Sequence, residues 1–197
     1  MRPLGPVLLA ASLLAAGAAS AHEIPKTDMG VAIRATHQLL SLDRGVPGSM
    51  HGLAVSQHAR FDEHVGAQVT VSFATGVDPH GYGRTDLEFV MPAILLFFGS
   101  KDHVRPYFST GFVMTTSFYH GSAPSIGGMV YAGNRTSLGF EWHRTKKLSF
   151  LFELSTTVRG RFAVDKEDHP VLAANPVFDR ASAVVHEGGL SLGVVLY

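Results

Sequence analysis

The chain has 197 residues, with 16 basic and 16 acidic side chains, 21 glycines and no cysteine. This length suits one domain, and the lack of cysteine excludes a disulfide framework. The balanced charge removes any electrostatic case for a nucleic-acid partner.

The N-terminus has the pattern of a secretory signal. Arg2 precedes an apolar run at residues 7–16, and the small residues Ala19-Ser20-Ala21 form a cleavage site. We therefore expect residues 1–21 to be a signal peptide and residues 22–197 to be the mature domain. A retained anchor is the alternative, but the run is shorter than the about 20 residues that a spanning helix needs. An exported chain without a helical anchor is either soluble or a barrel.

Eight segments of the mature chain alternate apolar and polar side chains with the period of two that is typical of β-strands. The alternation is strongest at residues 148–159, where leucine and phenylalanine oppose serine, glutamate and threonine, and weakest at residues 52–60. In chain order the predicted strands are 29–40, 52–60, 67–75, 85–98, 104–115, 129–142, 148–159 and 184–197.

The fourth segment is expected to change character along its length. Strict alternation directs Leu95 and Phe97 outward, on the same face as Leu87. Its inner face then begins with acidic residues and becomes apolar at Ile94 and Leu96. One end of the interior should therefore be drier than the other.

The connections alternate in length. Every second one is short, at residues 61–66, 99–103 and 143–147. A membrane barrel with both termini in the periplasm needs short periplasmic turns that alternate with long external loops. The predicted external loops are residues 41–51, 76–84, 116–128 and 160–180.

Two segments carry a family resemblance. In GGLSLGVVLY (residues 188–197), alternate apolar residues oppose glycine and serine, and VRPYFSTGF (residues 104–112) places arginine, proline and tyrosine at the start of a strand. Both resemble small outer-membrane β-barrels of the OmpA/OmpX type. The resemblance covers most of the mature chain and implies an all-β, eight-stranded antiparallel up-and-down transmembrane barrel in the outer membrane of a Gram-negative bacterium. In that family the terminal aromatic shares the apolar face, whereas Tyr197 is one place out of step and is expected to point inward.

The interior of an eight-stranded barrel is just wide enough to be filled by side chains. We interpret the inward charged residues as a buried ion network, with a proton path or small pore as the alternative. The predicted network is Arg34, Glu88, Arg105, Glu141, Glu153, Arg159 and Glu187. Aromatic residues near the short turns are expected to form a belt at the level of the lipid headgroups. They are Phe97, Phe108, Trp142 and Phe150.

The 11 histidines are scattered, without the i, i+2 or i, i+4 spacing of a metal site. We expect solvated loop and turn histidines, no metal and no cofactor. A mature N-terminal His22 could chelate copper with its own amine, as in copper-dependent polysaccharide oxygenases, but nothing else in the chain resembles those enzymes.

The pattern favours a non-enzymatic barrel with a structural or surface-binding role. Its expected partners are outer-membrane lipid, lipopolysaccharide and the barrel-assembly machinery, and it is expected to be a monomer. One alternative is a lipid A deacylase, because His120-Gly121-Ser122 has the histidine–serine spacing of that family. The serine-asparagine-alanine continuation of the family motif is missing, and Asn175-Pro176 resembles it only weakly. The other is a soluble exported lipocalin-type barrel, which would invert the two faces, with Glu153 and Arg159 outside.

Overall fold

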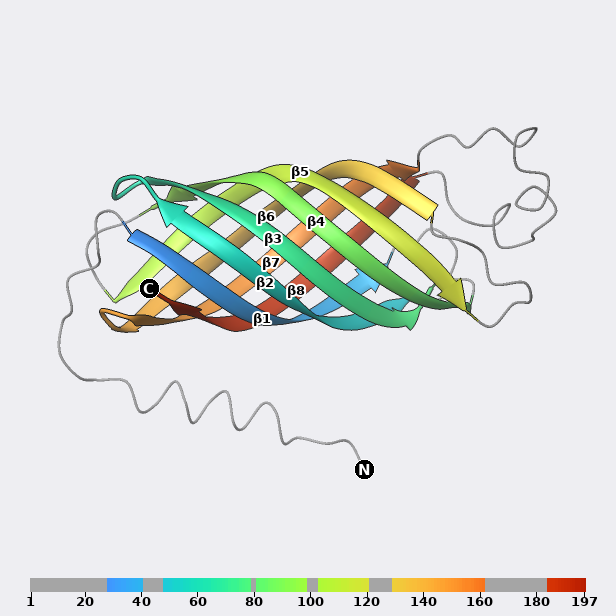
Figure 1. Ribbon diagram of the computed structural model, residues 1–197, viewed down its shortest axis with the longest axis horizontal. Coiled ribbons are helices and arrows are strands. Elements are labelled where there is room, and N and C mark those ends of the chain that lie inside the picture. The colour runs from blue at the N-terminus through green and yellow to red at the C-terminus, as the bar shows by residue number, and fades with distance from the viewer. Residues whose placement is uncertain (1–27, 41–47, 79–80, 99–102, 121–128, 162–183) are drawn as a thin grey trace, which may run out of the picture.

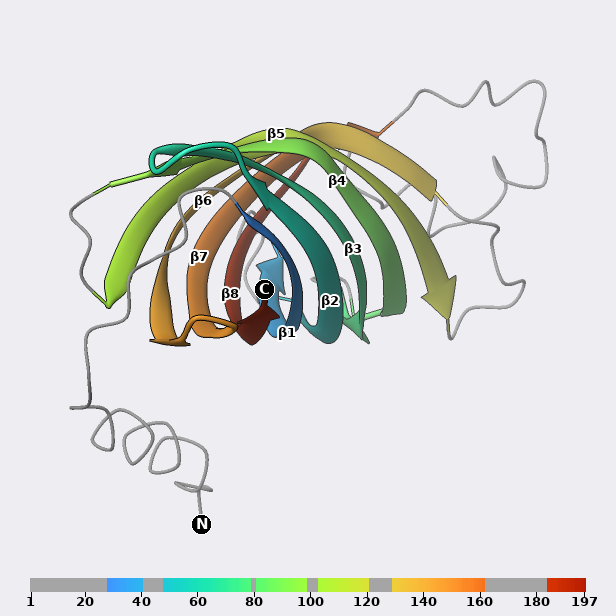
Figure 2. The same ribbon diagram turned by 60° about the vertical axis from the view of Figure 1, so that its left-hand side comes forward.

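The computed structural model describes residues 28–40, 48–78, 81–98, 103–120, 129–161 and 184–197. They form a closed antiparallel barrel in which each strand pairs with its sequence neighbours and the last strand pairs with the first (Figures 1 and 2). The predicted eight-stranded up-and-down barrel is confirmed. The strands are β1 (Asp28–Leu40), β2 (Ser49–Arg60), β3 (Val65–Val77), β4 (Gly83–Phe97), β5 (Val104–His120), β6 (Met129–Thr145), β7 (Leu148–Arg161) and β8 (Val184–Leu196).

The described residues contain no helix that is long and apolar enough to cross a membrane. The predicted signal peptide, His22, Ser122, Asn175 and most of the loop at residues 160–180 lie outside the described residues.

The barrel has a turn end and a loop end (Figure 1). The turn end holds the start of β1, the end of β8 and the three short connections. At the β2–β3 turn, the Asp62 carboxylate accepts backbone N–H hydrogen bonds from His64 (2.6 Å) and Val65 (2.7 Å). These bonds favour the charged carboxylate and hold the pKa of Asp62 below its ordinary value.

Several strands extend further toward the loop end than the sequence predicts. His51, Arg84 and His120, which were expected in loops, are residues of β2, β4 and β5. The pairing continues through them, as His37 opposite His51 and Gly83 opposite His120 show. These strand ends carry polar residues on both faces, so hydrophobic alternation does not mark them.

The second half of β4 faces the opposite way from the prediction. The β4–β5 pairing shifts between Val90 and Ala93, a region that contains Pro92, which has no N–H to donate to a ladder. An irregularity of this kind exchanges the two faces of the rest of the strand. Leu95 (2% exposed) and Phe97 (4% exposed) therefore point inward, whereas Ile94 and Leu96 are exposed on the outside.

Candidate functional site

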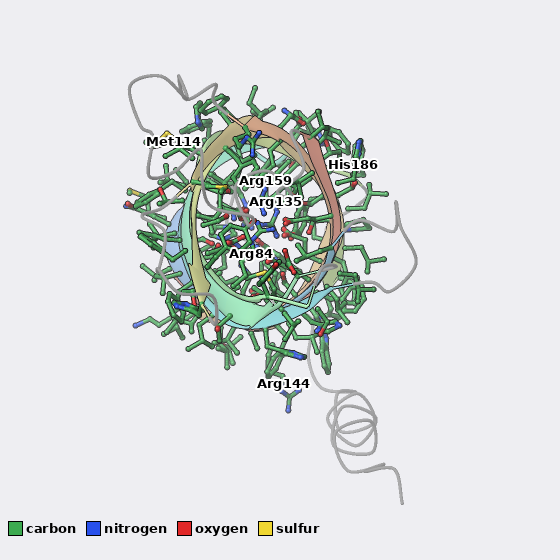
Figure 3. The ribbon with its side chains drawn as sticks, turned by 90° about the vertical axis from the view of Figure 1, so that its right-hand side faces the viewer. Arg84, Met114, Arg135, Arg144, Arg159 and His186 are labelled. Atoms are coloured by element: carbon green, nitrogen blue, oxygen red, sulfur yellow. The ribbon has the colours of Figure 1, made fainter. Side chains whose placement is uncertain are left out.

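The barrel interior gathers the charged side chains of the strands (Figure 3). Alternation places every second side chain of a strand inside, and the polar set of each strand points there. Six arginines and six carboxylates are buried among the described residues, so the positive and negative charges balance. The twelve are Arg34, Arg60, Arg84, Arg105, Arg135, Arg159, Asp78, Asp86, Glu88, Glu141, Glu153 and Glu187.

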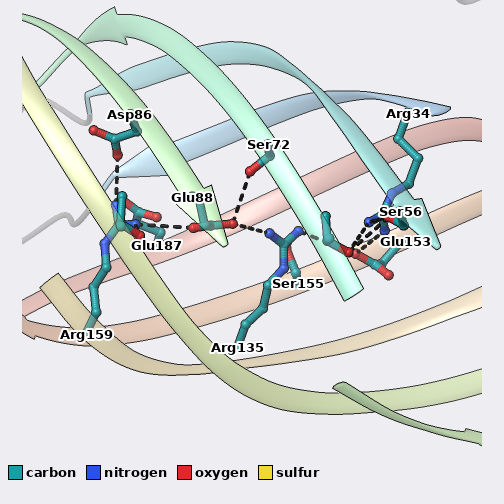
Figure 4. Close-up of polar contacts among 12 residues, drawn as sticks. Arg34, Ser56, Ser72, Asp86, Glu88, Arg135, Glu153, Ser155, Arg159 and Glu187 are labelled. Carbon is teal, nitrogen blue, oxygen red and sulfur yellow. Dashed lines mark hydrogen bonds and ion pairs between the residues drawn. The ribbon is translucent and has the colours of Figure 1, made fainter. Parts of the chain in front are cut away.

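Arg159 lies at the loop end of this network and forms ion pairs with several of its acids (Figure 4). Its guanidinium pairs with Asp86 (3.0 Å), Glu88 (3.2 Å) and Glu187. Asp86 also accepts two hydrogen bonds from Arg84, at 2.7 and 2.6 Å. One guanidinium thus contacts three acids of β4 and β8, in the multidentate geometry for which arginine is suited, and Arg84 and Arg135 share these acids with it.

The network continues through the middle of the barrel as alternating charges (Figure 4). Arg135 bridges Glu88 (2.7 Å) and Glu153 (3.4 Å), and Arg34 pairs with Glu153 at 3.1 Å. The Tyr107 hydroxyl donates to Glu153 at 2.8 Å. Such a chain offsets the cost of burying each charge, because every ion has an opposite neighbour.

A cavity of about 10 Å³ lies beside Arg34, Arg135 and Glu153, with Gln68 and Thr70 among the other lining residues. That volume holds about one water molecule. Side chains therefore fill the interior at this level, as expected for eight strands.

A second cluster closes the turn end around Glu141. Arg60 donates to Glu141 at 2.8 Å, and the Tyr197 hydroxyl donates to the same carboxylate oxygen at 2.8 Å. Arg60 also donates to the Tyr197 hydroxyl at 2.9 Å. Tyr197 points inward, as its position one place out of step with the apolar face predicts.

Removing this hydroxyl tests the cluster. We expect Tyr197→Phe to lower the free energy of unfolding by about 1.5–3 kcal/mol, because two hydrogen bonds to charged groups are lost. Denaturant unfolding of the folded barrel measures the change. Tyr119→Phe is the matched control, since among the described residues its hydroxyl forms one long hydrogen bond, with the Tyr131 hydroxyl at 3.5 Å. Equal losses in the two variants would contradict the role of Tyr197.

The structure adds members to the predicted network. One predicted member, Arg105, contacts an aromatic ring. The guanidinium of Arg105 lies over the ring of Phe97, 4.6 Å from its centroid. The additions on the strands are Arg60, Arg84, Asp86 and Arg135, and the fifth buried charge that was not predicted is Asp78, which directly follows β3. Arg135 and Arg84 could have been found from their sequence, because they occupy the same alternate positions as Glu141 and Glu88, respectively.

Two histidines contradict the expectation of solvated loop and turn residues. His58 and His143 are each only 3% exposed, and both lie inside the barrel next to Glu141. His143 Nε2 is 3.3 Å and His58 Nδ1 is 3.9 Å from this carboxylate. Within the described part of the chain, no group of three or more His, Cys, Asp or Glu side chains is placed to hold a metal ion.

The predicted aromatic belt is only partly placed where it was expected. Trp142 and Phe150 contact each other on the outer surface near the turn end, with ring centroids 5.6 Å apart, and Phe108 is half-buried on the same surface. Phe97 is a correction, because the shift in β4 turns its ring into the interior.

The outer surface is apolar. Large hydrophobic side chains of all eight strands are exposed, among them Ile33, Leu53, Phe73, Leu154 and Leu192. The lipocalin-type alternative is wrong, because it requires the reverse distribution of side chains. Glu153 and Arg159 are 2% and 1% exposed, whereas Leu154 is 54% exposed.

The barrel is similar to several solved outer-membrane proteins. Neisserial surface protein A (NspA) superposes with a TM-score of 0.64 at 13% identity, over 87% of this chain and 99% of that one. This chain therefore has the fold of the small outer-membrane β-barrels. Ail of Yersinia pestis gives a TM-score of 0.56 at 10% identity, with 87% and 99% covered, and the outer-membrane enzyme PagL gives 0.54 at 11% identity, with 82% and 97% covered. No family model and no curated protein match the sequence.

Proposed function

We propose that this protein is a non-enzymatic barrel that spans the outer membrane of a Gram-negative bacterium and presents its long loops at the cell surface. One observation carries the proposal: the charges are inside and the large apolar side chains are outside. Monomers in water rarely expose a continuous apolar surface of this kind, whereas lipid favours it.

The level of the barrel in the membrane follows from its turn end. Trp142 and Phe150 lie there, and Arg144, Lys146 and Lys147 are exposed beside them. Tryptophan and basic side chains favour the headgroup region. Outer-membrane barrels have their short turns on the periplasmic side. The turn end then faces the periplasm, and the loop end faces the exterior.

The loops carry the specific role in this proposal, because a filled interior leaves the two ends as the places for recognition. Among the solved structures similar in fold is Ail bound to the heparin analogue sucrose octasulfate, so a barrel of this shape can present a binding surface. For this chain, outer-membrane lipid and lipopolysaccharide are the proposed surroundings of the wall. Insertion by the barrel-assembly machinery as a monomer completes the proposal.

Fractionation tests the membrane location and the orientation together. We expect the protein in the outer-membrane fraction, soluble only with detergent and with heat-modifiable migration on a gel. A tag inserted at Asp168 should be accessible to antibody on intact cells, whereas a tag at Lys146 should become accessible only after the outer membrane is opened. Recovery as a monodisperse soluble periplasmic protein would contradict the proposal, and the reverse accessibility of the tags would contradict the orientation.

Two observations favour the deacylase alternative. His120 is exposed on the outer face at the loop end, where its Nε2 lies 2.9 Å from the Thr85 hydroxyl, and PagL has a similar fold. A nucleophilic serine also needs an oriented base. We expect mass spectrometry of lipid A to find the same acylation in cells with and without the protein. Loss of an acyl chain that Ser122→Ala prevents would establish the enzyme instead.

A further inference from the structure

Two histidines meet on the outer wall near the loop end. His37 of β1 is paired directly with His51 of β2, and their Nδ1 atoms are 3.0 Å apart. The ring centroids are separated by 4.5 Å, and His51 is exposed. The two are distant in sequence, so spacing along the chain does not reveal them. The register of the β1–β2 hairpin brings them together.

The separation of the two nitrogens fits a metal chelate. At 3.0 Å, one Nδ1 can donate a shared proton to the other. If a metal ion were bound to both nitrogens at about 2.0–2.1 Å, the N–metal–N angle would be roughly 91–97°. Neighbouring ligands in square-planar and octahedral sites have that angle, and such sites suit Cu²⁺ and Ni²⁺ better than tetrahedral Zn²⁺.

Among the described residues, the side chains next to the pair carry no positive charge. In register, His37 lies beside Leu190 of β8, and His51 lies beside Thr75 of β3. The next outward residues on the two strands are apolar or small: Ala35, Leu39, Ser49 and Leu53. The pair lies on the outer face, separate from the arginine-rich interior, and His51 is exposed there.

We propose that His37 and His51 chelate one Cu²⁺ or Ni²⁺ ion through both Nδ1 atoms, with water at the remaining positions. Both nitrogens must be unprotonated to bind, so affinity decreases as the pH falls. The site goes beyond the proposed barrel role and does not depend on which ligand the loops recognise.

Copper titration of the full chain tests the site. The untagged protein, folded in detergent micelles, is titrated with Cu²⁺ by calorimetry, and electron paramagnetic resonance reports the number of nitrogen ligands. We expect a site with two imidazole nitrogens that is lost in both His37→Ala and His51→Ala. His186→Ala is the matched control, because His186 also lies outside the barrel, on β8 (Figure 3). An unchanged site in either variant of the pair, or equal loss in His186→Ala, would overturn the proposal.

A second measurement avoids the variants altogether, in case one of them does not fold. Diethylpyrocarbonate modifies accessible imidazoles, and peptide mass spectrometry identifies which ones. We expect Ni²⁺ to protect His37 and His51 together in the unaltered protein while His186 still reacts. Equal modification of the pair with and without Ni²⁺ would also overturn the proposal.

Discussion

Replacing Arg159 with methionine is expected to lower the free energy of unfolding by about 3–5 kcal/mol, the cost of leaving a buried partner charge uncompensated. Arg159 is 1% exposed and pairs with Asp86, Glu88 and Glu187 at once. Methionine keeps much of the volume but leaves these carboxylates close together with less positive charge among them. Urea unfolding from lipid vesicles, followed by the fluorescence of the single tryptophan, measures the loss.

Arg144→Met is the control for this experiment. Arg144 is exposed at the turn end and points away from the barrel in Figure 3. Its replacement should change stability by no more than about 0.5 kcal/mol. Adding Glu187→Gln to Arg159→Met should recover part of the loss, because the two side chains are in contact and their effects are not independent. Unfolding of Arg159→Met and Arg144→Met at the same urea concentration would contradict the buried network.

Replacing Leu192 with arginine is expected to cost about 2–4 kcal/mol if the residue lies near the midplane of the bilayer. Leu192 is 49% exposed on the outer face of β8, so the charge would face the hydrocarbon directly. The same vesicle unfolding measures the change. The size of this effect rests on the proposed membrane location.

Leu196→Arg supplies the depth control on the same face of the same strand. Leu196 is 54% exposed but is the last residue of β8, at the turn end. Near the headgroups an arginine should cost only about 0–1 kcal/mol. Equal losses at Leu192 and Leu196 would show that the apolar wall does not cross a bilayer in the proposed orientation.

Both large effects have the same origin. The distribution of apolar and charged side chains between the inside and the outside is the reverse of that in a water-soluble barrel. A water-soluble barrel keeps its apolar residues inside, whereas this one exposes Leu154 and buries Glu153 beside it in sequence. In the proposed membrane location, lipid stabilises the wall and ion pairs stabilise the interior, so each face is destabilised by a side chain suited to the other. This explains why neighbouring positions on one strand should respond oppositely to charge.

The sequence by itself determined the number of strands and their order, but not the strict alternation of long and short connections, because β3 and β4 extend further toward the loop end than predicted and leave only residues 78–82 between them. Period-two alternation is a local property, and it survives wherever one face of a strand is apolar. It also directed Tyr197 inward, which the hydrogen bond of its hydroxyl to Glu141 bears out. Alternation is symmetrical between the two faces, however, so the periodicity alone could not distinguish a lipid-facing wall from an apolar lumen.

The tertiary structure decided which side chains meet. The shift near Pro92 reverses the faces of β4 and moves Phe97 inside, an effect that strict alternation has no means of showing. Arg135 gains its two carboxylates from β4 and β7, and His37 gains His51 from the next strand. These contacts depend on strand register and barrel closure, which join residues far apart in the chain, and spacing along a sequence carries no direct record of either.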